Sequence, residues 1–493
     1  NSAYDLPEAR RGFALVAYNG FLYALGGMDG AGNREATVLI AKLGANGEPS
    51  LWHPTDTNKN NWVYWYQDSG LSGGTARSYL AAAAYNNRLY VLGGQTNAAT
   101  TGTTTMEYAT INPAGTLSSW SSGAALPSSR QKHSAHIYND VLYLIGGDSG
   151  GTLQNSVYYN KLNADGSMNS WTQTSSFSTA RSTMGGNFST VWGAYIYLAG
   201  GCTSTTGASN YYCTTVATDT QIASINADGS LTPWNGISSL QNQRVGYTLV
   251  SWQNGLYRLG GCSQQNTTTG ECISTLADVD YGVVNPAGEV STVSISVPSG
   301  TSPCSGASPY GCNLPPTGDD AGEGGQMLSM SVIMNGYLYV IGGCIDYDCS
   351  GTNPAGDDAD ATGNISYVAV DPNGRLAAPA SCSGTSYGAW CVDSTNRING
   401  TTGVAAGGVA TFANRIYVVG GLTGAALSTN IYYNSVNTDG SLAGAWSSVD
   451  MTTAGIAERS SAASPAVMLT AARVPAAAAM YTNCGALVQS PAA

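Results

Sequence analysis

Lysine and other charged residues are scarce in this chain. Only four of its 493 residues are Lys, the charged types together make up 10%, and the net charge is −12. A surface with so few cations repels the phosphates of nucleic acids, which excludes sequence-independent nucleic-acid binding. An acidic surface is better suited to divalent cations or neutral glycans.

Long apolar runs are also missing. A helix needs roughly 20 apolar residues to cross a bilayer, and the longest alanine-rich stretch, 471–480, is interrupted by Arg473 and Pro475. We therefore expect no membrane span in this chain. Because Asn1 opens directly into repeat-like sequence, we expect any signal peptide or anchor to have been removed or to lie outside it.

Patterns that carry catalysis are absent. The only histidines are His53, His133 and His136, and the last two, spaced by three in one expected strand, point to opposite faces of it. This excludes a converging copper site. There is no Cys-x-x-Cys zinc knuckle, Gly-x-Ser-x-Gly elbow, phosphate loop or paired-carboxylate signature. We therefore expect binding rather than catalysis, although distant loops can assemble a site.

Cysteine is present in a telling arrangement. Ten of the eleven cysteines form close neighbours in loops rich in Ser, Thr and Gly. Such local pairs indicate disulfides and an oxidising compartment, hence an extracellular or cell-surface location. Cys484 is left over, as a free thiol or an intermolecular bridge. The expected pairs are Cys202 with Cys213, Cys262 with Cys272, Cys304 with Cys312, Cys344 with Cys349, and Cys382 with Cys391.

One pattern recurs seven times: an apolar strand, a tight turn, a strand containing Leu-Tyr or Ile-Tyr, and Gly-Gly. Asn-Gly, Asn-Asn or Asn-Asp in the turn supplies the positive φ of a two-residue hairpin. Gly-Gly allows close backbone packing where a Cβ would clash. The seven copies are AYNGFLYALGG ending at Gly27, AYNNRLYVLGG at Gly94, IYNDVLYLIGG at Gly147, VWGAYIYLAGG at Gly201, SWQNGLYRLGG at Gly261, IMNGYLYVIGG at Gly343 and TFANRIYVVGG at Gly421.

A second pattern follows most doublets: an alternating strand, an Asp-Gly or Ala-Gly turn, and a strand that ends on Trp. The clearest copies are 156–171 and 431–446. Each unit then has four strands, a to d, which cannot bury both faces alone and must stack radially.

This combination of doublets, preceding aromatics and later Trp resembles the kelch repeat. The resemblance implies an all-β fold, a seven-bladed β-propeller of four-stranded kelch-type blades. We assign residues 1–450 to the propeller and 451–493 to a C-terminal tail. The fold itself does not specify a function.

The distribution of insertions is more informative about function. Successive doublets are 67, 53, 54, 60, 82 and 78 residues apart, against about 50 for a bare kelch unit. Strands alternate in direction, so the b–c and d–a connections share one face of the disc. We expect every long insertion on that face, where they would bind a ligand or merely shield blade edges. The long segments are 202–219, 262–277 and 344–364 (b–c) and 53–75, 299–325 and 381–403 (d–a).

Two groups are candidate binding residues. Trp62, Tyr64, Trp65 and Tyr66 form an aromatic cluster in the first d–a insertion, suited to sugar rings or protein contacts; alternatively, Trp62 or Trp65 packs between blades. An acidic loop offers oxygen ligands for calcium, or is simply solvated. No other cofactor is expected. The acidic candidates are Asp346, Asp348, Asp357, Asp358 and Asp360.

Smaller features complete the expectation. Arginines recur before strand a. They would form a ring of hydrogen-bond donors for a ligand or, as we favour, bond the neighbouring backbone. Sequons mark candidate glycosylation sites. The sequence of the tail is similar to an a–b half repeat. We expect it to form a partial blade, to close the ring, or to donate a strand to a partner. The arginines are Arg11, Arg77, Arg130, Arg181 and Arg244, and the sequons are at Asn187, Asn266, Asn364 and Asn399.

Together these features indicate an extracellular binding or structural protein, with an adhesive role at the cell surface and a glycan or protein as ligand. The long loops on one face, the disulfides and the acidic surface favour this function. The alternative is a secreted carbohydrate-active enzyme with its site at the mouth of the central channel.

Overall fold

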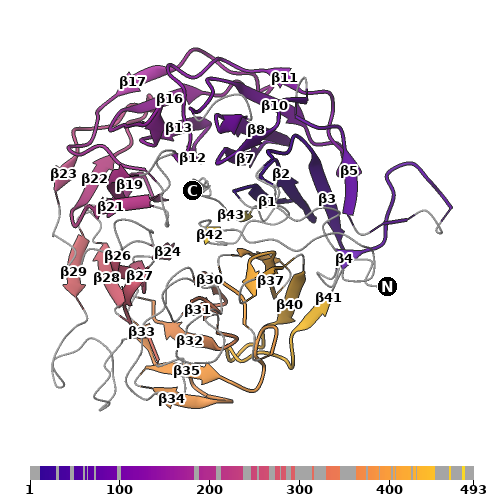
Figure 1. Ribbon diagram of the computed structural model, residues 1–493, viewed down its shortest axis with the longest axis vertical. Coiled ribbons are helices and arrows are strands. Elements are labelled where there is room, and N and C mark those ends of the chain that lie inside the picture. Colours follow the sequence, from indigo (N-terminus) through magenta and orange to yellow (C-terminus); the bar gives the residue numbers. More distant parts are fainter. Residues whose placement is uncertain are drawn as a thin grey trace.

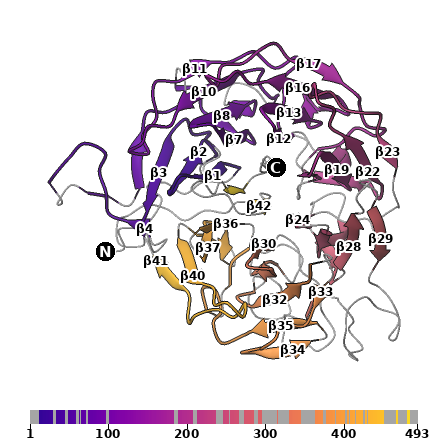
Figure 2. The same cartoon turned by 180° about the vertical axis from the view of Figure 1, so that it is seen from behind.

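Seven antiparallel sheets are arranged in a ring in the computed structural model (Figures 1 and 2). Each sheet is one of the predicted repeats, so the all-β, seven-bladed propeller is confirmed. The structure describes residues 12–28, 33–44, 49–58, 62–63, 65–71, 74–96, 101–182, 188–206, 212–236, 246–252, 255–265, 272–277, 279–284, 290–294, 314–315, 329–344, 362–372, 376–387, 389–400, 403–405, 407–412, 414–423, 426–428, 430–449, 466–467 and 480–482.

Five blades consist of four strands in the order a, b, c, d, with strand a nearest the axis of the ring (Figure 1). Blade 2 has β7 (Ala81–Tyr85), β8 (Arg88–Leu92), β10 (Met106–Thr110) and β11 (Ser121–Ser122); blade 3 has β12 (Ser134–Tyr138), β13 (Val141–Ile145), β16 (Val157–Lys161) and β17 (Thr172–Thr174). Blade 4 has β18 (Ser189–Trp192), β19 (Tyr195–Ala199), β22 (Thr220–Ser224) and β23 (Asn235–Gly236); blade 5 has β24 (Thr248–Trp252), β25 (Gly255–Leu259), β28 (Val279–Val284) and β29 (Val290–Ser294). Blade 7 has β36 (Gly408–Phe412), β37 (Arg415–Val419), β40 (Ile431–Ser435) and β41 (Ser447–Val449).

Strand d is split in the other two blades. Blade 1 has β1 (Ala14–Tyr18), β2 (Phe21–Leu25), β3 (Val38–Leu43) and a strand d made of β4 (Pro49–Ser50) and β5 (Trp65–Asp68), which both pair with β3. Blade 6 has β30 (Met330–Met334), β31 (Tyr337–Ile341), β32 (Ile365–Val370) and a strand d made of β33 (Leu376–Ala377) and β35 (Trp390–Asp393); β34 (Thr385–Tyr387) pairs with β35. In both blades the insertion leaves the outermost strand.

Short two-stranded sheets stand beside the blades, on the face that carries the b–c connections. Four of them are hairpins that begin directly after a glycine doublet, and the fifth pairs the segment before strand a with the segment after strand b. The hairpins are β14 (Asp148–Ser149) with β15 (Thr152–Leu153), β20 (Cys202–Thr206) with β21 (Tyr212–Val216), β26 (Cys262–Gln265) with β27 (Cys272–Thr275), and β38 (Leu422–Thr423) with β39 (Ala426–Leu427); the fifth sheet is β6 (Arg77–Ser78) with β9 (Gln95–Thr96).

The a–b turns have the predicted hairpin geometry. In blade 2 both turn residues, Asn86 and Asn87, have positive φ (46° and 55°), and Asn139 and Asp140 repeat this in blade 3 (44° and 61°). Asn and Asp tolerate this conformation better than other side chains, which explains their place at these turns.

The doublets are required because the next blade's backbone lies against them. A Cβ on Gly93 would lie 2.4 Å from the carbonyl oxygen of Arg130, and both doublet glycines have positive φ. The second glycine then bonds the same carbonyl: Gly94 N–H donates to Arg130 O at 2.8 Å. The doublet is therefore a point of backbone-to-backbone contact between blades, as its composition predicts.

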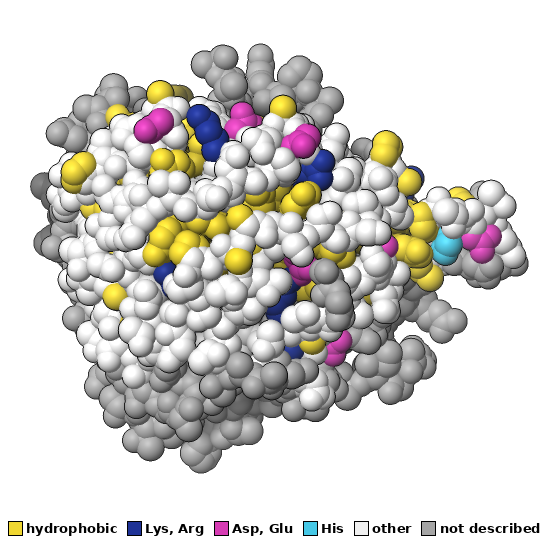
Figure 3. Space-filling view, turned by 90° about the horizontal axis from the view of Figure 1, so that it is seen from above, with side chains coloured by type: hydrophobic (Ala, Val, Ile, Leu, Met, Phe, Trp, Pro, Cys, Tyr) yellow, Lys and Arg dark blue, Asp and Glu magenta, His cyan; other side chains and the backbone are white. Residues whose placement is uncertain are grey.

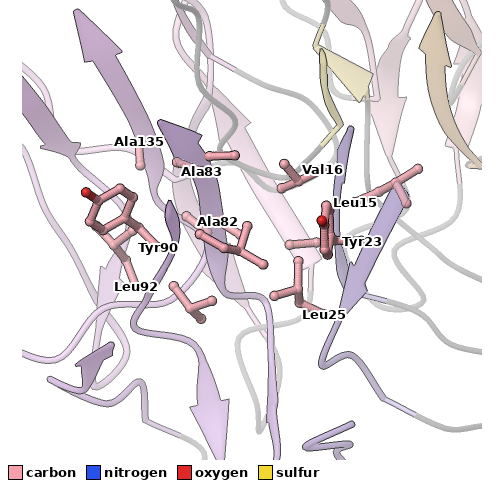
Figure 4. Close-up of a cluster of buried hydrophobic side chains, with 14 of the residues drawn as sticks. Leu15, Val16, Tyr23, Leu25, Ala82, Ala83, Tyr90, Leu92 and Ala135 are labelled. Atoms are coloured by element: carbon pink, nitrogen blue, oxygen red, sulfur yellow. The ribbon is translucent and has the colours of Figure 1, made fainter. Parts of the chain in front are cut away.

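Apolar side chains of strands a and b fill the spaces between blades. Figure 4 shows this packing for blades 1 to 3, where Val16, Leu25, Ala83 and Leu92 lie among their neighbours, and each is at most 1% exposed. Alanine in strand a keeps the innermost strands close together. This interblade packing is the main source of the ring's stability.

On the face opposite the glycine doublets, a tyrosine hydroxyl of strand b links neighbouring blades. Strand b contains a tyrosine in all seven blades, each 0% exposed. Where its partner is described, the hydroxyl donates to a glycine carbonyl in the c–d turn of the next blade. These bonds are Tyr23 to Gly115 (2.9 Å), Tyr90 to Gly166 (2.9 Å), Tyr143 to Gly229 (2.8 Å) and Tyr339 to Gly440 (2.6 Å).

Two strands of the tail lie inside the ring (Figure 2). They are β42 (Ala466–Val467) and β43 (Met480–Thr482), which pair with each other, and β43 also pairs with β1 and contacts β36. The tail thus adds a strand to the inner edge of blade 1, beside blade 7. Among the described residues, no helix has the length and apolar character that a bilayer crossing requires.

Candidate functional site

The expected single decorated face needs a correction. Segments 53–75 and 381–403 were expected as d–a insertions, but the first part of each interrupts strand d. The first, which we call the rim arm (51–64), lies between β4 and β5, and the second, the rim hairpin (378–389), lies between β33 and β35. Both therefore leave the outer edge of the ring. Segment 299–325 lies outside the described residues apart from 314–315.

The described b–c hairpins do lie on one face, and a disulfide braces the one in blade 4. Cys202 on β20 is bonded to Cys213 on β21, with 5.7 Å between their Cα atoms, and Cys202 is fully buried. Cys262 and Cys344, each directly after a doublet, are also disulfide-bonded. These insertions are thus fixed at their base, next to the buried doublets.

A second disulfide braces the rim hairpin. Cys382 in the hairpin is bonded to Cys391 on β35, as predicted from their spacing. Next to it, Ser381 Oγ donates to Asp439 Oδ2 at 2.7 Å, which ties the hairpin of blade 6 to the c–d turn of blade 7. The structure does not describe the side chains of the other five cysteines, which are Cys272, Cys304, Cys312, Cys349 and Cys484.

The rim arm carries the aromatic cluster predicted from the sequence, but its members differ in accessibility. Trp65 is 3% exposed and belongs to the core, as the alternative interpretation had it. Trp62 is half-buried, and its indole N–H donates to Asp56 O at 2.8 Å. Tyr66 is half-buried on β5, and Tyr64 lies outside the described residues.

Aromatic packing holds the base of the arm against blade 1. Trp52, 4% exposed, packs between Phe21 and Tyr66, with ring centroids 5.4 and 5.6 Å away. The His53 ring meets Tyr66 edge-on at 5.2 Å, and its Nδ1 accepts the backbone N–H of Asp56 at 2.9 Å. Such packing supplies rigidity before any ligand arrives.

The arm also exposes apolar surface. Leu51 and Val63 are 41% and 40% exposed, and they are the only large hydrophobic side chains so exposed in the described ranges. They flank Trp52, whose backbone pairs with that of Val63 through two hydrogen bonds of 3.0 Å. The space-filling view shows the segment standing away from the body of the disc, with apolar, histidine and acidic side chains (Figure 3).

The recurring arginines are structural. Arg77, Arg130 and Arg181 are at most 1% exposed. Arg77 and Arg181 each donate to the first doublet glycine of their own blade, Gly93 O (3.0 Å) and Gly200 O (2.7 Å). A ligand cannot reach these guanidinium groups, which agrees with the structural interpretation. Arg11 and Arg244 lie outside the described residues.

Carboxylates neutralise some of these buried cations. Arg77 is ion-paired with Glu107, which is 1% exposed, and burial lowers the pKa of Arg77 to about 10. Burial alone would raise the pKa of Asp219, but its hydrogen bond to Arg181 (2.9 Å) and the arginine charge lower it below its usual range. These pairs stabilise the blade interiors, because each of these two buried cations has a carboxylate partner.

The two buried histidines are unsuited to acid–base work. Burial lowers the pKa of both His133 and His136 to about 3, so both are neutral at physiological pH. His136 Nε2 lies 2.8 Å from Ser189 Oγ of the next blade. Within the described ranges no group of three or more metal-ligating side chains occurs.

Several predicted sites remain predictions. The calcium candidates Asp346 to Asp360 lie outside the described residues, as do the sequons at Asn187 and Asn266. Asn364 is 8% exposed, which leaves little room for a glycan. Asn399 is half-buried, and its Nδ2 donates to Gly403 O at 3.2 Å.

Comparison with known proteins gives a partial match to one curated protein. Over 139 residues the chain is 34% identical to alpha-scruin of Limulus polyphemus, a stretch that covers 26% of this chain and 14% of that protein. The chain thus matches only a small part of its relative's length. No protein-family profile matches the chain.

A solved structure, "Structure of YjhT", aligns with 76% of this chain and 99% of its own, at 12% identity and a TM-score of 0.46. The repeats, the ring and the local sequence match to alpha-scruin support the predicted resemblance to kelch repeats. The chain is a seven-bladed β-propeller with kelch-like repeats.

Proposed function

We propose that the protein is an extracellular binding propeller, an adhesive or structural component of the cell surface that holds a glycan or protein ligand. The observation that carries this proposal is the rim arm. It combines exposed Leu51 and Val63 with the accessible aromatics Trp62 and Tyr66, on a base fixed by buried Trp52. Apolar surface presented on a rigid projection is typical of interaction sites.

Charge and disulfides support the location and the ligand class. Disulfides persist in oxidising compartments, and the chain contains the pairs Cys202–Cys213 and Cys382–Cys391. With a net charge of −12, the surface disfavours anionic polymers and suits neutral sugars or basic protein patches. Mass spectrometry of the native protein without reduction tests the location: free thiols at these four positions would contradict it.

The ligand proposal is tested by binding assays on the whole chain. Glycan arrays and adhesion of whole cells are compared for the parent, Trp62→Ala and Val63→Ser, with Trp65→Ala as a control for folding. We expect the first two variants to lose binding about tenfold with an unchanged melting temperature, whereas Trp65→Ala melts earlier because it leaves a core cavity. No interaction on arrays and in adhesion, or equal binding by the arm variants, contradicts the proposal.

Calcium is the cation we propose for the acidic loop that contains Asp346, Asp348 and Asp357. Carboxylate oxygens in flexible loops are its usual ligands. A melting temperature that rises with calcium and returns with a chelator supports the site. An unchanged melting temperature contradicts it.

A further inference from the structure

His53 lies at the base of the rim arm, directly after the core residue Trp52. It is half-buried, and its ring meets Tyr66 of β5 edge-on with 5.2 Å between the ring centroids. The other two histidines, His133 and His136, are 0% exposed. His53 is therefore the one histidine of the chain that solvent reaches, and histidine is the side chain that gains a charge in mild acid.

Two backbone N–H groups of the arm have the Nδ1 atom of His53 as their acceptor. The nitrogen of Asp56 lies 2.9 Å from it and that of Thr55 lies 3.3 Å from it, so the ring closes a short turn over residues 53–56. A ring nitrogen accepts a hydrogen bond only when it carries no proton. The turn therefore requires the neutral ring with its proton on Nε2, because an imidazolium has an N–H group at both nitrogens and accepts neither bond.

Asp56 connects this turn to Trp62. The backbone oxygen of Asp56 accepts the indole N–H of Trp62 at 2.8 Å, and its Oδ1 accepts the N–H of Asn58 at 2.8 Å. The hydrogen bonds thus run from His53 through Asp56 to the indole. A movement of Asp56 would displace the acceptor of Trp62, which is one of the accessible aromatics of the arm.

The titratable and charged groups around His53 come from the arm itself, from β5 and from β3, the next strand of the sheet. Asp68 is turned to blade 2, where its Oδ2 accepts the N–H of Leu117 at 2.7 Å. The Asp56 carboxylate belongs to the turn itself, and a protonated His53 ring that turned to it would also leave the Asp56 N–H without its acceptor. Protonation therefore breaks the turn in either case. The groups are Asp56, Tyr66, Asp68 and Lys42, and Lys59 of the arm lies outside the described residues.

We propose that the rim arm is a pH-sensitive switch with His53 as its sensor. At neutral pH the ring holds the 53–56 turn closed and keeps Trp62 in place. In mild acid Nδ1 takes up a proton from solvent, the bonds from Thr55 and Asp56 break, and Trp62 loses its anchor. The opening of the arm needs no ligand. Only its consequence, that a bound ligand is released in acid, rests on the proposed function.

Hydrogen-exchange mass spectrometry of the full chain at pH 7.5 and pH 5.5 tests the switch, after correction for the intrinsic effect of pH on amide exchange. The readout is the peptide that contains the amides of Thr55 and Asp56. In the parent we expect these amides to exchange about tenfold faster at pH 5.5 than the correction alone predicts, because each has lost its acceptor.

Two variants at the same position are the matched controls. In His53→Asn the side-chain oxygen accepts the N–H groups of the turn at every pH, as Asn does in turns, so the arm stays closed in acid. His53→Phe keeps a ring against Tyr66 but has no acceptor, so the arm is open at both pH values. His133 and His136 are unchanged in both variants, so their titration cannot produce the difference.

The inference is overturned if the parent is equally protected at both pH values, or if His53→Asn loses protection in acid as the parent does. This comparison decides the matter even where His53→Phe fails to fold by circular dichroism. Whole-cell adhesion at the same two pH values tests the proposed function separately. An arm that opens in acid without weakening adhesion keeps the switch and contradicts the arm as the binding site.

Discussion

The two faces of the ring are held together by different chemistry. On the b–c face, buried arginines connect glycine doublets, and Arg77 does so with a buried carboxylate, Glu107. On the a–b face, neutral tyrosine hydroxyls bond glycine carbonyls of the next blade, as Tyr90 does to Gly166. Removing one partner of a buried ion pair leaves the other charge buried and costs much stability, whereas removing one neutral hydrogen bond costs less. The face with variable insertions therefore contains the links that are most sensitive to the loss of one partner.

The largest expected effect is the loss of Arg77. Arg77→Ala leaves the Glu107 carboxylate buried without its cation, and we expect the free energy of unfolding to fall by about 3–5 kcal/mol, measured by urea denaturation. Arg181→Ala is the control, because its partner Asp219 is 35% exposed and water can solvate it. Equal losses in the two variants would contradict the importance of burial.

The next effect concerns the braced hairpin of blade 4. Replacing Cys202 and Cys213 by Ser opens a loop with a sequence separation of 11. We expect the free energy of unfolding to fall by about 3 kcal/mol, because the unfolded chain gains conformational entropy without the bond. Thermal melts with and without a reductant measure it. The reduced parent should melt no higher than the double variant, because reduction also opens Cys382–Cys391 and the bonds of Cys262 and Cys344. A parent that is insensitive to reduction argues against the bond.

Acid should weaken the doublet contact between blades 2 and 3. His133 is 0% exposed, and its pKa falls to about 3 on folding from about 6.5 in the unfolded chain. The unfolded chain therefore binds the proton first: stability is complete above pH 6.5 and declines as the pH falls towards 3. At pH 5 the loss from His133 is about 2 kcal/mol.

The variant His133→Leu checks this pH dependence. Leu80 takes the equivalent place in blade 2, where its Cβ lies against the second doublet glycine as that of His133 does. Denaturation of both proteins at pH 7 and pH 5 gives the comparison. A decline that is equally steep in the variant would assign the acid sensitivity to other groups.

The smallest expected effect belongs to the tyrosine bonds. Tyr143→Phe removes the donor to Gly229 O, and we expect a loss of about 1 kcal/mol, measured by urea denaturation. Tyr138→Phe removes a hydroxyl that has no partner in the described residues, so it should leave stability unchanged. Similar losses for both would mean that the hydroxyl bonds do not define the a–b face.

Much of this architecture could be predicted from the residues. Seven doublets predicted seven blades, and the Asn-rich turns predicted the hairpin geometry seen at Asn86 and Asn139. The local spacing of Cys202 and Cys213, and of Cys382 and Cys391, predicted the two disulfides whose partners are both described. These features depend on local backbone geometry, which sequence patterns report directly.

The position of the rim insertions could not be predicted in this way. Strand d in blade 1 begins with only Pro49 and Ser50 before the arm, and two residues carry no alternation to recognise. The bonds that Tyr18 and Tyr85 make to the next blade were also missed, although a signal exists. Aligning the repeats places Asn87 and Asp140 at the same turn position, and the interblade contacts reveal that each of them bonds the tyrosine of the preceding blade.

The four strands a to d of each blade come from one continuous stretch of chain, for example 14–68 in blade 1 and 408–449 in blade 7, and only blade 1 gains a further strand, β43, from the described part of the tail. Blades 1 and 7 therefore exchange none of their a-to-d strands across their junction. Tension between blades 1 and 7 would part them there while each sheet stays whole. The short β43 segment, which touches β1 and β36, is placed to share that load.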